Sequence, residues 1–440
     1  MLVLFKRLHS KVRIARLLAV AVFSVVAMPT LAQPEITATN TLTLAAARQI
    51  ALQRNWDLLA AKTGLDAARA QWLVAKEFPN PTFSISSAKI GSHENATPTG
   101  NGLWSRSYDT IFAVNQLLEI GGKRADRQAS ARAGVAGAQA RFEDARRVLA
   151  QGVTKVYVAA LLAGENARIL EESARLLRHE RELAQARLRA GDLSAADAKQ
   201  IENSADVYAL QAQAAAAAAV QARIAVDILL GAEHPQGDWQ PAEALDGIAT
   251  NEPVVKPFGC AERSDVQAAA ADLRQSQADL KLQRAMRIPD PTVSLLVEHN
   301  PPGGGPPEDT VGIGVSIPLP LWNRNHGEIQ SAQATVAKNE LALAKARAQA
   351  AADVALARSA WQEATDRLVR YEKQIRPNAG AVRAAVAFAY EKGGASLVDL
   401  LEAERADNDA RLATAQAQAD SASAVADLNA ALAGATDANP

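Results

Sequence analysis

The sequence predicts a mainly α-helical protein with a small β part and an internal two-fold structural repeat. Aromatic residues account for only 4% of the 440 residues, while Ala, Leu, Gln, Glu, Arg and Lys dominate, as expected for long helices packed side by side. Two short motifs each occur twice: FPNPT at 78–82 returns as IPDPT at 288–292, and GDLS at 191–194 returns as GGAS at 393–396. The chain is therefore expected to consist of two similar halves.

The N-terminus has the features of a secretion signal. Basic residues precede a short apolar run at 17–26, and the small residues Thr30 and Ala32 suit signal peptidase, so residues 1–32 are expected to be a signal peptide. The alternative is a membrane anchor, but the run is well short of the ~20 residues that a spanning helix needs. No later stretch is expected to cross a membrane as a helix. Cys260, the only cysteine, cannot form an intrachain disulfide.

Charge and motif content argue against several classes of function. The formal net charge is -1, which gives no sign of binding to nucleic acid or to an anionic membrane surface. The six histidines are scattered, and no cluster of His, Cys, Asp and Glu has the spacing of metal ligands. The sequence also contains no catalytic constellation. We therefore expect no enzyme activity, no cofactor and no dedicated metal site.

Each half is expected to contain a helix, a two-strand insert, a long helix and a shorter return helix. The first repeat covers 33–231 and begins with a helix at about 43–76; the second covers 264–440, and an irregular linker at 232–263 separates them. Each long helix should be matched by two shorter helices laid end to end. Pro377 lies inside the second long helix and should kink it or start a new segment. The strands are expected at 82–90, 108–118, 292–299 and 310–318.

The predicted strands have the pattern of a membrane β-sheet. Branched residues alternate with Gly or Ser through 311–317 (VGIGVSI), which suits a lipid-facing side and a lumen-facing side. Strands of roughly eight to ten residues can cross a bilayer when tilted. Four strands cannot close a barrel, and an open edge is not tolerated in lipid. Several chains are therefore expected to contribute to a shared transmembrane β-barrel; a small soluble sheet packed on helices is the alternative.

Three segments carry a resemblance to a known family. Residues 116–124 (QLLEIGGKR), 317–327 (IPLPLWNRNHG) and 389–401 (AYEKGGASLVDLL) resemble motifs of the TolC-like outer-membrane efflux factors, and the first two are similar to the heavy-metal (CzcC-like) branch. The resemblance extends over essentially all of the mature chain. The lipid-anchor cysteine of some relatives is absent here, so that attachment is not expected.

The resemblance implies a fold and a function. It implies a homotrimer in which four strands per protomer form one twelve-stranded barrel in the outer membrane, above a long periplasmic α-helical barrel of coiled-coil hairpins. It further implies the channel of a tripartite efflux system, whose partners are a periplasmic adaptor and an inner-membrane pump. The cargo implied is heavy-metal cations such as cobalt, zinc or cadmium.

Two groups of residues are candidate functional sites. At the helix reversals, lumen-facing carboxylates would occur three times around a trimer axis and favour cations, although a solvated helix face or a helix cap is the alternative. The tip group, a candidate adaptor contact or gate, comprises Gly191, Asp192, Gly393, Gly394, Asp399 and Glu402. Asp192 and Asp197 are the expected counterparts of Asp399 and Glu402 in the first half. The barrel-to-helix junction group comprises Gly121, Gly122, Lys123, Pro318, Pro320, Asn323, Arg324, Asn325 and Gly327.

Two other functions remain open at this stage. The same type of channel could serve efflux of drugs or organic solutes, or type I protein secretion. A soluble periplasmic coiled-coil adaptor is the alternative from another class. An adaptor should have one helical hairpin flanked by compact β domains, whereas this sequence has two similar helical halves, each with a two-strand insert.

Overall fold

The structure is a computed structural model that describes residues 41–88, 109–249, 263–300 and 308–433. The predicted signal peptide, Cys260 and the outer ends of two predicted strands lie outside the described residues. The chain divides into the units 1–40 and 41–440, so every described residue belongs to the second unit.

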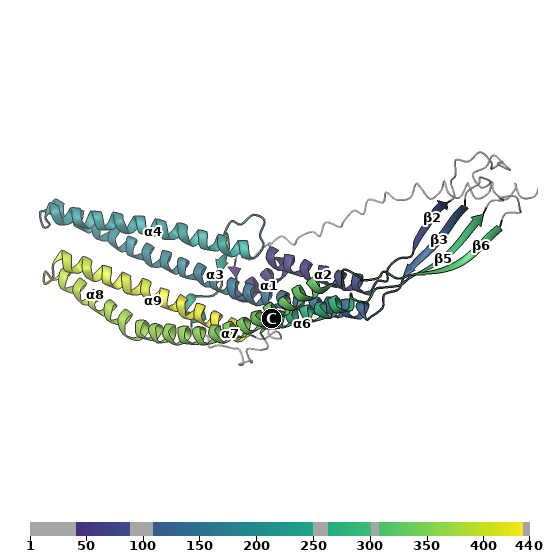
Figure 1. Cartoon of the computed structure of the whole chain (residues 1–440). Helices are drawn as coiled ribbons and strands as arrows, with labels where there is room; N and C mark the ends of the chain where they lie inside the picture. Colours follow the sequence, from purple (N-terminus) through teal and green to yellow (C-terminus); the bar gives the residue numbers. More distant parts are fainter. Residues whose placement is uncertain (1–40, 89–108, 250–262, 301–307, 434–440) are drawn as a thin grey trace, which may run out of the picture. The chain divides into compact units, whose positions relative to one another are not determined.

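Helices make up most of the described chain, as the sequence predicts (Figure 1). The two longest, α3 and α7, each lead into a tight reversal and a return helix, and the second pair includes the short continuation α8. The helices are α1 (Leu44–Arg54), α2 (Trp56–Lys76), α3 (Lys123–Ala190), α4 (Ala195–Leu229), α5 (Leu245–Ala249), α6 (Ser264–Ala285), α7 (His326–Arg370), α8 (Arg376–Glu391) and α9 (Leu397–Leu432).

The first helix is interrupted at Asn55, where the sequence predicts one continuous helix. The Asn55 side chain accepts a hydrogen bond from the backbone N–H of Leu58 (3.0 Å) and so caps α2. Its Nδ2 donates to the carbonyl oxygen of Leu229 (3.0 Å), at the end of α4. Asn55 is buried, and an N-cap of this kind starts a new helix. The interruption therefore depends on a distant partner that the local composition does not reveal.

The second long helix changes its winding just before Pro377, which confirms the expected new segment. A π-helical turn, η3 (Tyr371–Ile375), joins α7 to α8, and Pro377 stands in the first turn of α8. Proline is tolerated there because the first N–H groups of a helix have no intrahelical partner. Gln418 of α9 donates to the Glu372 carboxylate within the π-helical turn (2.9 Å). The neighbouring helix α9 therefore stabilises this turn.

Four antiparallel strands form one sheet, at the opposite end of the helices from the reversals (Figure 1). Their order is β2-β3-β5-β6, so β2 and β6 are its two edges. The last strand ends before Pro318, which has no N–H to donate to a ladder. The strands are β2 (Thr82–Ala88), β3 (Asp109–Leu117), β5 (Thr292–Asn300) and β6 (Glu308–Ser316).

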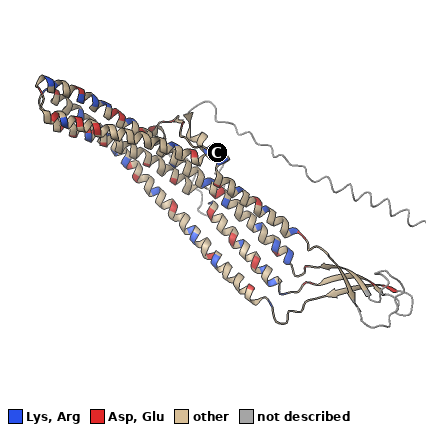
Figure 2. Cartoon of the chain, turned by 90° about the horizontal axis from the view of Figure 1, so that it is seen from above, with Lys and Arg blue, Asp and Glu red and all other residues tan. Residues whose placement is uncertain are grey.

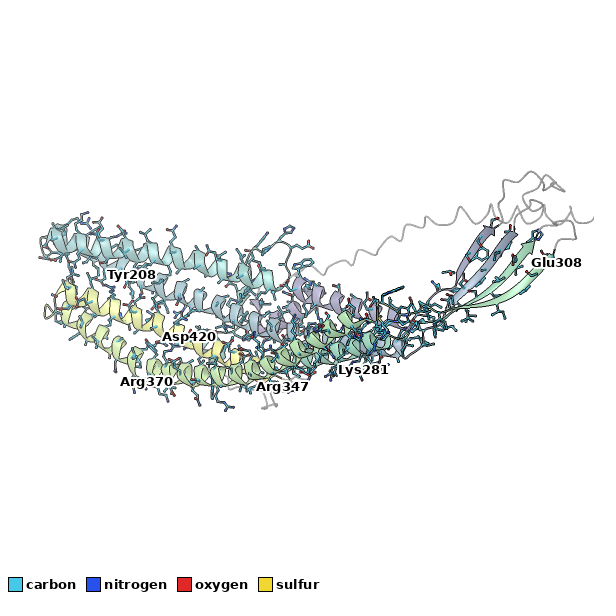
Figure 3. The ribbon with its side chains drawn as sticks, in the orientation of Figure 1. Tyr208, Lys281, Glu308, Arg347, Arg370 and Asp420 are labelled. Atoms are coloured by element: carbon cyan, nitrogen blue, oxygen red, sulfur yellow. The ribbon has the colours of Figure 1, made fainter. Side chains whose placement is uncertain are left out.

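Each long helix is flanked end to end by two shorter ones. The N-terminal part of α3 packs on α2 and α6, and its C-terminal part packs on α4 and α9. Thus Arg141 of α3 binds Asp272 of α6 (2.8 Å), whereas Glu172 farther along α3 binds Arg411 of α9 (2.5 Å). Helix α7 packs on α6 and then on α9, where Arg367 binds Asp420 (2.8 Å; Asp420 is labelled in Figure 3).

Two of the described helices, α3 and α4, are long and apolar enough to cross a membrane by length and composition alone. This match in length and composition does not show that either helix crosses a membrane, and the sequence predicts no membrane-spanning helix after the N-terminus. The reason for the match is alanine, since α4 contains the run AAAAAAV at 214–220. Such a test is weak on its own, and the two helices pack against each other as a hairpin, with Arg181 beside Asp206 (3.4 Å).

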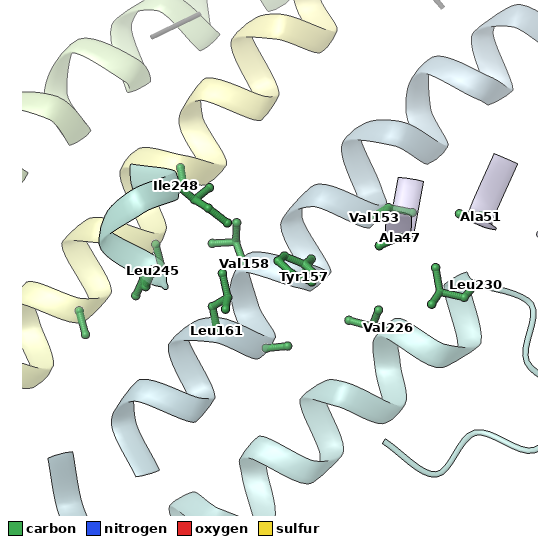
Figure 4. Packing of buried hydrophobic residues seen from close by; sticks show 14 of the residues in the cluster. Ala47, Ala51, Val153, Tyr157, Val158, Leu161, Val226, Leu230, Leu245 and Ile248 are labelled. Atoms are coloured by element: carbon green, nitrogen blue, oxygen red, sulfur yellow. The ribbon is translucent and has the colours of Figure 1, made fainter. Parts of the chain in front are cut away.

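The main hydrophobic cluster joins segments from both halves of the chain (Figure 4). Tyr157 of α3 lies at its centre and is fully buried. Side chains from α1, α4, α5 and α9 surround it, including Ala47, Val226, Leu245 and Ala419. Because these helices come from distant parts of the sequence, the cluster ties the start and the end of the described chain to the middle of α3.

The predicted irregular linker is ordered around this cluster in its described part. It contains β4 (Gln240–Pro241), which pairs in parallel with β1 (Thr41–Leu42), and the short helix α5. The Tyr157 hydroxyl, which has one proton to donate, faces two acceptors, the carbonyl oxygen of Leu42 (2.7 Å) and the carboxylate of Glu243, and its ring stacks on Trp239 (5.8 Å between centroids). Burial, reinforced by Glu243, raises the pKa of Tyr157, so its hydroxyl stays a donor.

Candidate functional site

The reversal between α3 and α4 is a glycine turn followed by a helix cap. Gly191 ends α3 with a φ of 82°, a conformation that favours glycine. The backbone N–H of Asp192 returns to the carbonyl oxygen of Arg187 (2.9 Å), while its side chain is exposed. Ser194 then caps α4 by accepting from the N–H of Asp197 (3.0 Å).

The reversal between α8 and α9 repeats this arrangement. Gly393 has a φ of 76°, and the N–H of Gly394 donates to the carbonyl oxygen of Ala389 (2.8 Å). Ser396 and Asp399 form a reciprocal capping box: the Asp399 N–H donates to the Ser396 hydroxyl (3.2 Å), and the Ser396 N–H donates to Oδ2 of Asp399 (2.8 Å). Helix caps therefore account for the position of Asp399.

The capping contacts also set the charge state of Asp399. Hydrogen bonds from the Ser396 hydroxyl and backbone N–H lower the pKa of this exposed carboxyl, so it is ionised at neutral pH. Its counterpart in the first repeat is Asp197, one of the two counterparts expected there, which stands in the same relation to Ser194; Asp192, the other, lies in the preceding turn. Glu402 is exposed one turn farther along α9.

The two reversals lie against each other through a small apolar cluster that the sequence did not single out. Ala184 of α3, Ile201 of α4 and Leu397 of α9 are buried there, and Tyr390 of α8 packs on them. The guanidinium of Arg187 lies over the Tyr390 ring at 6.0 Å. The only signal in the sequence is that large apolar residues flank turns that are otherwise small and polar.

At the first junction between sheet and helix, a buried lysine joins the two repeats. Lys123 opens α3, and its ammonium donates to the Asp290 carboxylate (2.7 Å) and to the carbonyl oxygen of Ile288 (2.5 Å). The N–H of Ile120 also donates to Asp290 (2.9 Å). Gly121 has a φ of 74°, which favours glycine, and an added Cβ would lie only 3.0 Å from Cδ1 of Ile288. Asp290 and Ile288 belong to the IPDPT motif, which the sequence marked as a repeat but not as a site.

Two arginines near the start of α3 cap the end of α2. The Arg124 guanidinium donates to the carbonyl oxygen of Lys76 (2.6 Å) and lies 3.9 Å from the Phe78 ring. Arg127 binds the Glu119 carboxylate (3.0 Å) and the carbonyl oxygen of Glu77 (3.2 Å). Cationic groups favour helix C-termini because the last carbonyl oxygens lack intrahelical partners. These contacts fix the direction in which β2 leaves α2.

The second junction has a different construction. Asn325 caps α7 with a φ of 60°, and its Nδ2 donates to the carbonyl oxygen of Gln283 at the end of α6 (2.8 Å). Asn323 accepts from the Asn325 N–H (2.9 Å). The structure thus brings Asn323 and Asn325 together, whereas Arg324, Gly327 and both prolines of the group, Pro318 and Pro320, lie exposed beside the turn. Gly122, at the first junction, is the N-cap of α3 with a φ of 81°.

The sheet has two chemically different faces. Cross-strand pairs on one face are branched or aromatic, such as Phe83 with Val114 and Leu295 with Ile313. Most residues on the other face are small or polar, as in the pair of Ser294 with Gly314, although Ile111 and Leu296 also stand on it. The charged residues of the strands stand near the loops, away from the helices, as Figure 2 shows and as the label of Glu308 in Figure 3 marks. They are Asp109, Glu298, Glu308 and Asp309.

Within the described ranges, no group of three or more His, Cys, Asp and Glu side chains is placed to hold a metal ion. A histidine of the sheet, His299, lies with its Nδ1 2.7 Å from Asp309 Oδ1, across β5 and β6. Both candidate sites are therefore built from turns, caps and ion pairs rather than from metal ligands.

A two-faced sheet continued by long helical hairpins is the fold of outer-membrane channel proteins. The solved outer-membrane channel OprN covers 89% of this chain and 90% of its own length with a TM-score of 0.75, at 21% sequence identity. The chain belongs to the outer membrane efflux protein family, whose family model matches residues 47–232 and 260–434.

Two relatives show where in this family the sequence lies. The cobalt-zinc-cadmium resistance protein CzcC of Cupriavidus metallidurans is 27% identical over 382 residues, which cover 84% of each chain. The nickel and cobalt resistance protein CnrC of the same organism is 30% identical over 292 residues, which cover 65% of this chain and 64% of CnrC.

The protein is thus an efflux channel of the outer membrane, from a family of channels and not of enzymes. The predicted membership of the TolC-like efflux factors and the predicted location are confirmed. The soluble periplasmic adaptor, kept open on sequence grounds, is ruled out by the family match.

Proposed function

We propose that three copies of the chain form one channel, in which their sheets join edge to edge into a shared transmembrane β-barrel and their helices continue as a periplasmic tunnel. The channel is the passive exit duct of a tripartite system, reached from an inner-membrane pump through a periplasmic adaptor. The observation that carries this proposal is a four-stranded sheet with one apolar face, whose two edge strands pair with no further strand among the described residues.

The open edges require partners in a membrane. Every unpaired backbone N–H or C=O in hydrocarbon costs several kcal/mol, and both β2 and β6 present such groups along one side. Within the sheet the apolar face is exposed, with Ile313 at 79% and Val315 at 64%. Lipid can cover that face, but only another strand can satisfy the edges, so copies of the same sheet are the natural partners.

The helices also leave apolar residues for a neighbour. Leu341 and Leu356 of α7 are 73% and 68% exposed, and Leu210 of α4 is 67% exposed. Single exposed leucines need no explanation, but these lie on the long helices that would line up around a tunnel. Contacts between protomers would bury them in the same way that α6 is buried between α3 and α7.

The tip group provides the periplasmic end of the channel in this proposal. The two reversals expose Asp192, Asp399 and Glu402, and the hydrogen bonds of Asp399 to Ser396 are made by Oδ2. Three copies would place these carboxylates around the entrance, where an adaptor docks or cations pass. The glycines Gly191, Gly393 and Gly394 permit the turns that present them.

The proposed cargo is heavy-metal cations such as cobalt, zinc or cadmium. The support is the chain's similarity to CzcC, whose name states resistance to cobalt, zinc and cadmium, and to CnrC, whose name states resistance to nickel and cobalt, together with acidic residues at the tips. Export of drugs or organic solutes is the competing outcome. We further propose that residues 1–32 are removed on export and that the mature chain comprises the two repeats joined by the linker at 232–263.

Two measurements test the proposal. The purified, detergent-extracted protein should have the mass of a trimer and should give discrete single-channel conductance steps in a planar bilayer; a monomer without conductance would contradict the shared barrel. Deletion of the gene should lower tolerance to cobalt, zinc or cadmium. Unchanged metal tolerance with reduced drug tolerance would retain the channel and overturn the cargo.

A further inference from the structure

We propose that β2 of one copy pairs antiparallel with β6 of the next copy in the register that sets Ser84 opposite Ser316 and Ser86 opposite Gly314. The inference rests on the shared barrel of the proposed function and adds the residue-level pairing at its seam. It follows from the internal repeat, from the direction of the backbone groups and from the chemistry of the two faces.

The repeat identifies equivalent positions in the two hairpins. Thr82 of β2 and Thr292 of β5 are the last residues of the matching motifs FPNPT and IPDPT. Thr82 lies opposite Asn115 of β3, and Thr292 lies opposite Ser316 of β6. Asn115 and Ser316 are therefore equivalent, which aligns β3 with β6 as well as β2 with β5.

The pairing between the two hairpins then predicts the pairing between copies. Within the chain, β3 of the first hairpin pairs with β5 of the second, and Leu117 lies opposite Thr292. Leu117 is two residues beyond Asn115, so its equivalent on β6 is Pro318. A seam that repeats this pairing sets Pro318 opposite Thr82 of the next copy. One step into the sheet at a time, the same register sets Ile317 opposite Phe83, Ser316 opposite Ser84 and Val315 opposite Ile85.

The backbone groups agree with this register. The N–H of Leu118 donates to the carbonyl oxygen of Pro291 (2.9 Å), which marks the residues of β3 that point toward β5. In antiparallel ladders the direction alternates from residue to residue and from strand to strand. Applied strand by strand from β3 to β2 and from β5 to β6, this alternation means that the backbone N–H and C=O groups of the odd-numbered residues in β2 and β6 point toward the open edges. The proposed register sets odd residues opposite odd residues, so each free N–H meets a free C=O.

The prolines after β6 fit the same geometry. Pro318 is an even-numbered position, where a backbone N–H would point toward its own sheet and not toward the next copy. Proline has no N–H, so the donor it lacks is one that the seam would not use. The N–H of Leu319, the equivalent of Leu118, is directed outward and would meet the carbonyl oxygen of Pro81 in the next copy.

The side chains exclude a shift by one residue. In the proposed register Ile85 joins Val315 on the apolar face, and Ser86 joins Gly314 on the small, polar face. A slip of one residue would move the whole set of one strand to the wrong face. A slip of two residues keeps both faces and the hydrogen-bond directions, so it is the alternative that an experiment has to separate.

Four positions on the small, polar face make that experiment possible. Two double-cysteine variants match the proposed register, Ser84→Cys with Ser316→Cys and Ser86→Cys with Gly314→Cys. The other two combinations, Ser84→Cys with Gly314→Cys and Ser86→Cys with Ser316→Cys, match slips of two residues in opposite directions. A Cβ at Gly314 would approach nothing closer than Ser294 at 3.7 Å, so this position accepts the change. All variants carry Cys260→Ser, which removes the one native cysteine.

The measurement is copper-phenanthroline oxidation of the purified full-length channel in detergent, followed by denaturing gels. We expect ladders of two and three linked chains for the two matched variants, at a rate at least about tenfold above the two slipped variants, because a disulfide requires Cβ atoms about 3.8 Å apart. Even-numbered pairs at this seam are not hydrogen-bonded to each other, which is the closer of the two pair types.

The outcomes separate the register from the proposed function. Faster linking in one slipped variant would overturn the register while keeping the shared barrel. A trimeric mass under reducing conditions without links in any variant would overturn the pairing of β2 with β6. A monomeric mass for the Cys260→Ser protein itself would contradict the proposed function, and the register with it.

Discussion

Lys123 and Asp290 form an ion pair of 2.7 Å in which the lysine side chain is only 8% exposed and the aspartate 18%. Lys123 opens the long helix of the first repeat, and Asp290 precedes the first strand of the second. The contact therefore joins the repeats at the level where the sheet becomes helix. The equivalent position to Asp290 in the first repeat is Asn80, which is exposed in the protomer.

Removal of one partner from this pair should weaken the junction. Asp290→Ala leaves a buried ammonium unpaired, and we expect a loss of on the order of 3 kcal/mol in the free energy of unfolding. Lys123→Met in the same chain should recover part of that loss, because the double variant has no uncompensated charge. Thermal unfolding followed by circular dichroism measures both. Asp192→Ala, at an exposed position, is the control; equal effects of Asp290→Ala and Asp192→Ala would contradict the prediction.

The left-handed cap of α7 should discriminate between substitutions at Asn325. Asn325→Ala loses the hydrogen bond to Gln283 and also strains the backbone, for a cost of about 2 kcal/mol. Asn325→Gly loses only the hydrogen bond, for about 1 kcal/mol. The order of the two unfolding temperatures checks this. An alanine variant as stable as the glycine variant would mean that the turn relaxes when the side chain is removed.

The contact between the two hairpins should depend on pH through Glu172. The hydrogen bond from Arg411 lowers the pKa of Glu172, so the contact stabilises the fold above the ordinary glutamate pKa and is lost as the pH falls through the lowered value. Glu172→Gln should therefore cost no more than about 1 kcal/mol at neutral pH, and the difference from the unsubstituted protein should shrink in acid. Unfolding temperatures at neutral and acidic pH measure it, with the exposed Glu340→Gln as control. A difference that grows in acid would contradict the assignment.

Substitutions at Asp399 and Ser396 can separate the effect of the negative charge from the effect of the helix cap. Asp399→Asn keeps an oxygen that can accept from the Ser396 N–H but removes the negative charge, whereas Ser396→Ala weakens the cap and keeps the charge. We expect Asp399→Asn to reduce cation selectivity, seen as a reversal potential closer to zero in a salt gradient, and Ser396→Ala to leave it unchanged. Ser396→Ala should instead speed amide exchange in the first turn of α9. An unchanged reversal potential for Asp399→Asn would leave Asp399 with a capping role alone.

The elements that the sequence located correctly are those with local signals. Glycines mark both reversals, and Pro377 marks the new helical segment, because each acts on its own backbone. The alternation in 311–317 located β6, which ends at Ser316, two residues short of the predicted limit, since Pro318 lacks a donor. Local chemistry was enough in these cases.

The features that the sequence missed depend on distant partners. Asn55 interrupts a helix by binding Leu229, and the predicted irregular linker is ordered because Glu243 and Trp239 bind Tyr157. The ion pair of Lys123 with Asp290 likewise joins residues far apart in the chain. Asp399 shows a different limit of sequence-based prediction. The spacing of Ser396 and Asp399 is compatible with a capping box, but only the structure shows that the two residues form one.

The cluster around Tyr157 has a practical consequence for work on this channel. Its members include Ala47, near the first described residue, and Ala422, toward the end of α9, so both ends of the described chain are anchored halfway along the helices. A purification tag or fluorescent label attached through a linker at the C-terminus would therefore start from the middle of the helices, remote from the sheet at one end and from the helix reversals at the other. Such a label could report on assembly while the two working ends remain unobstructed.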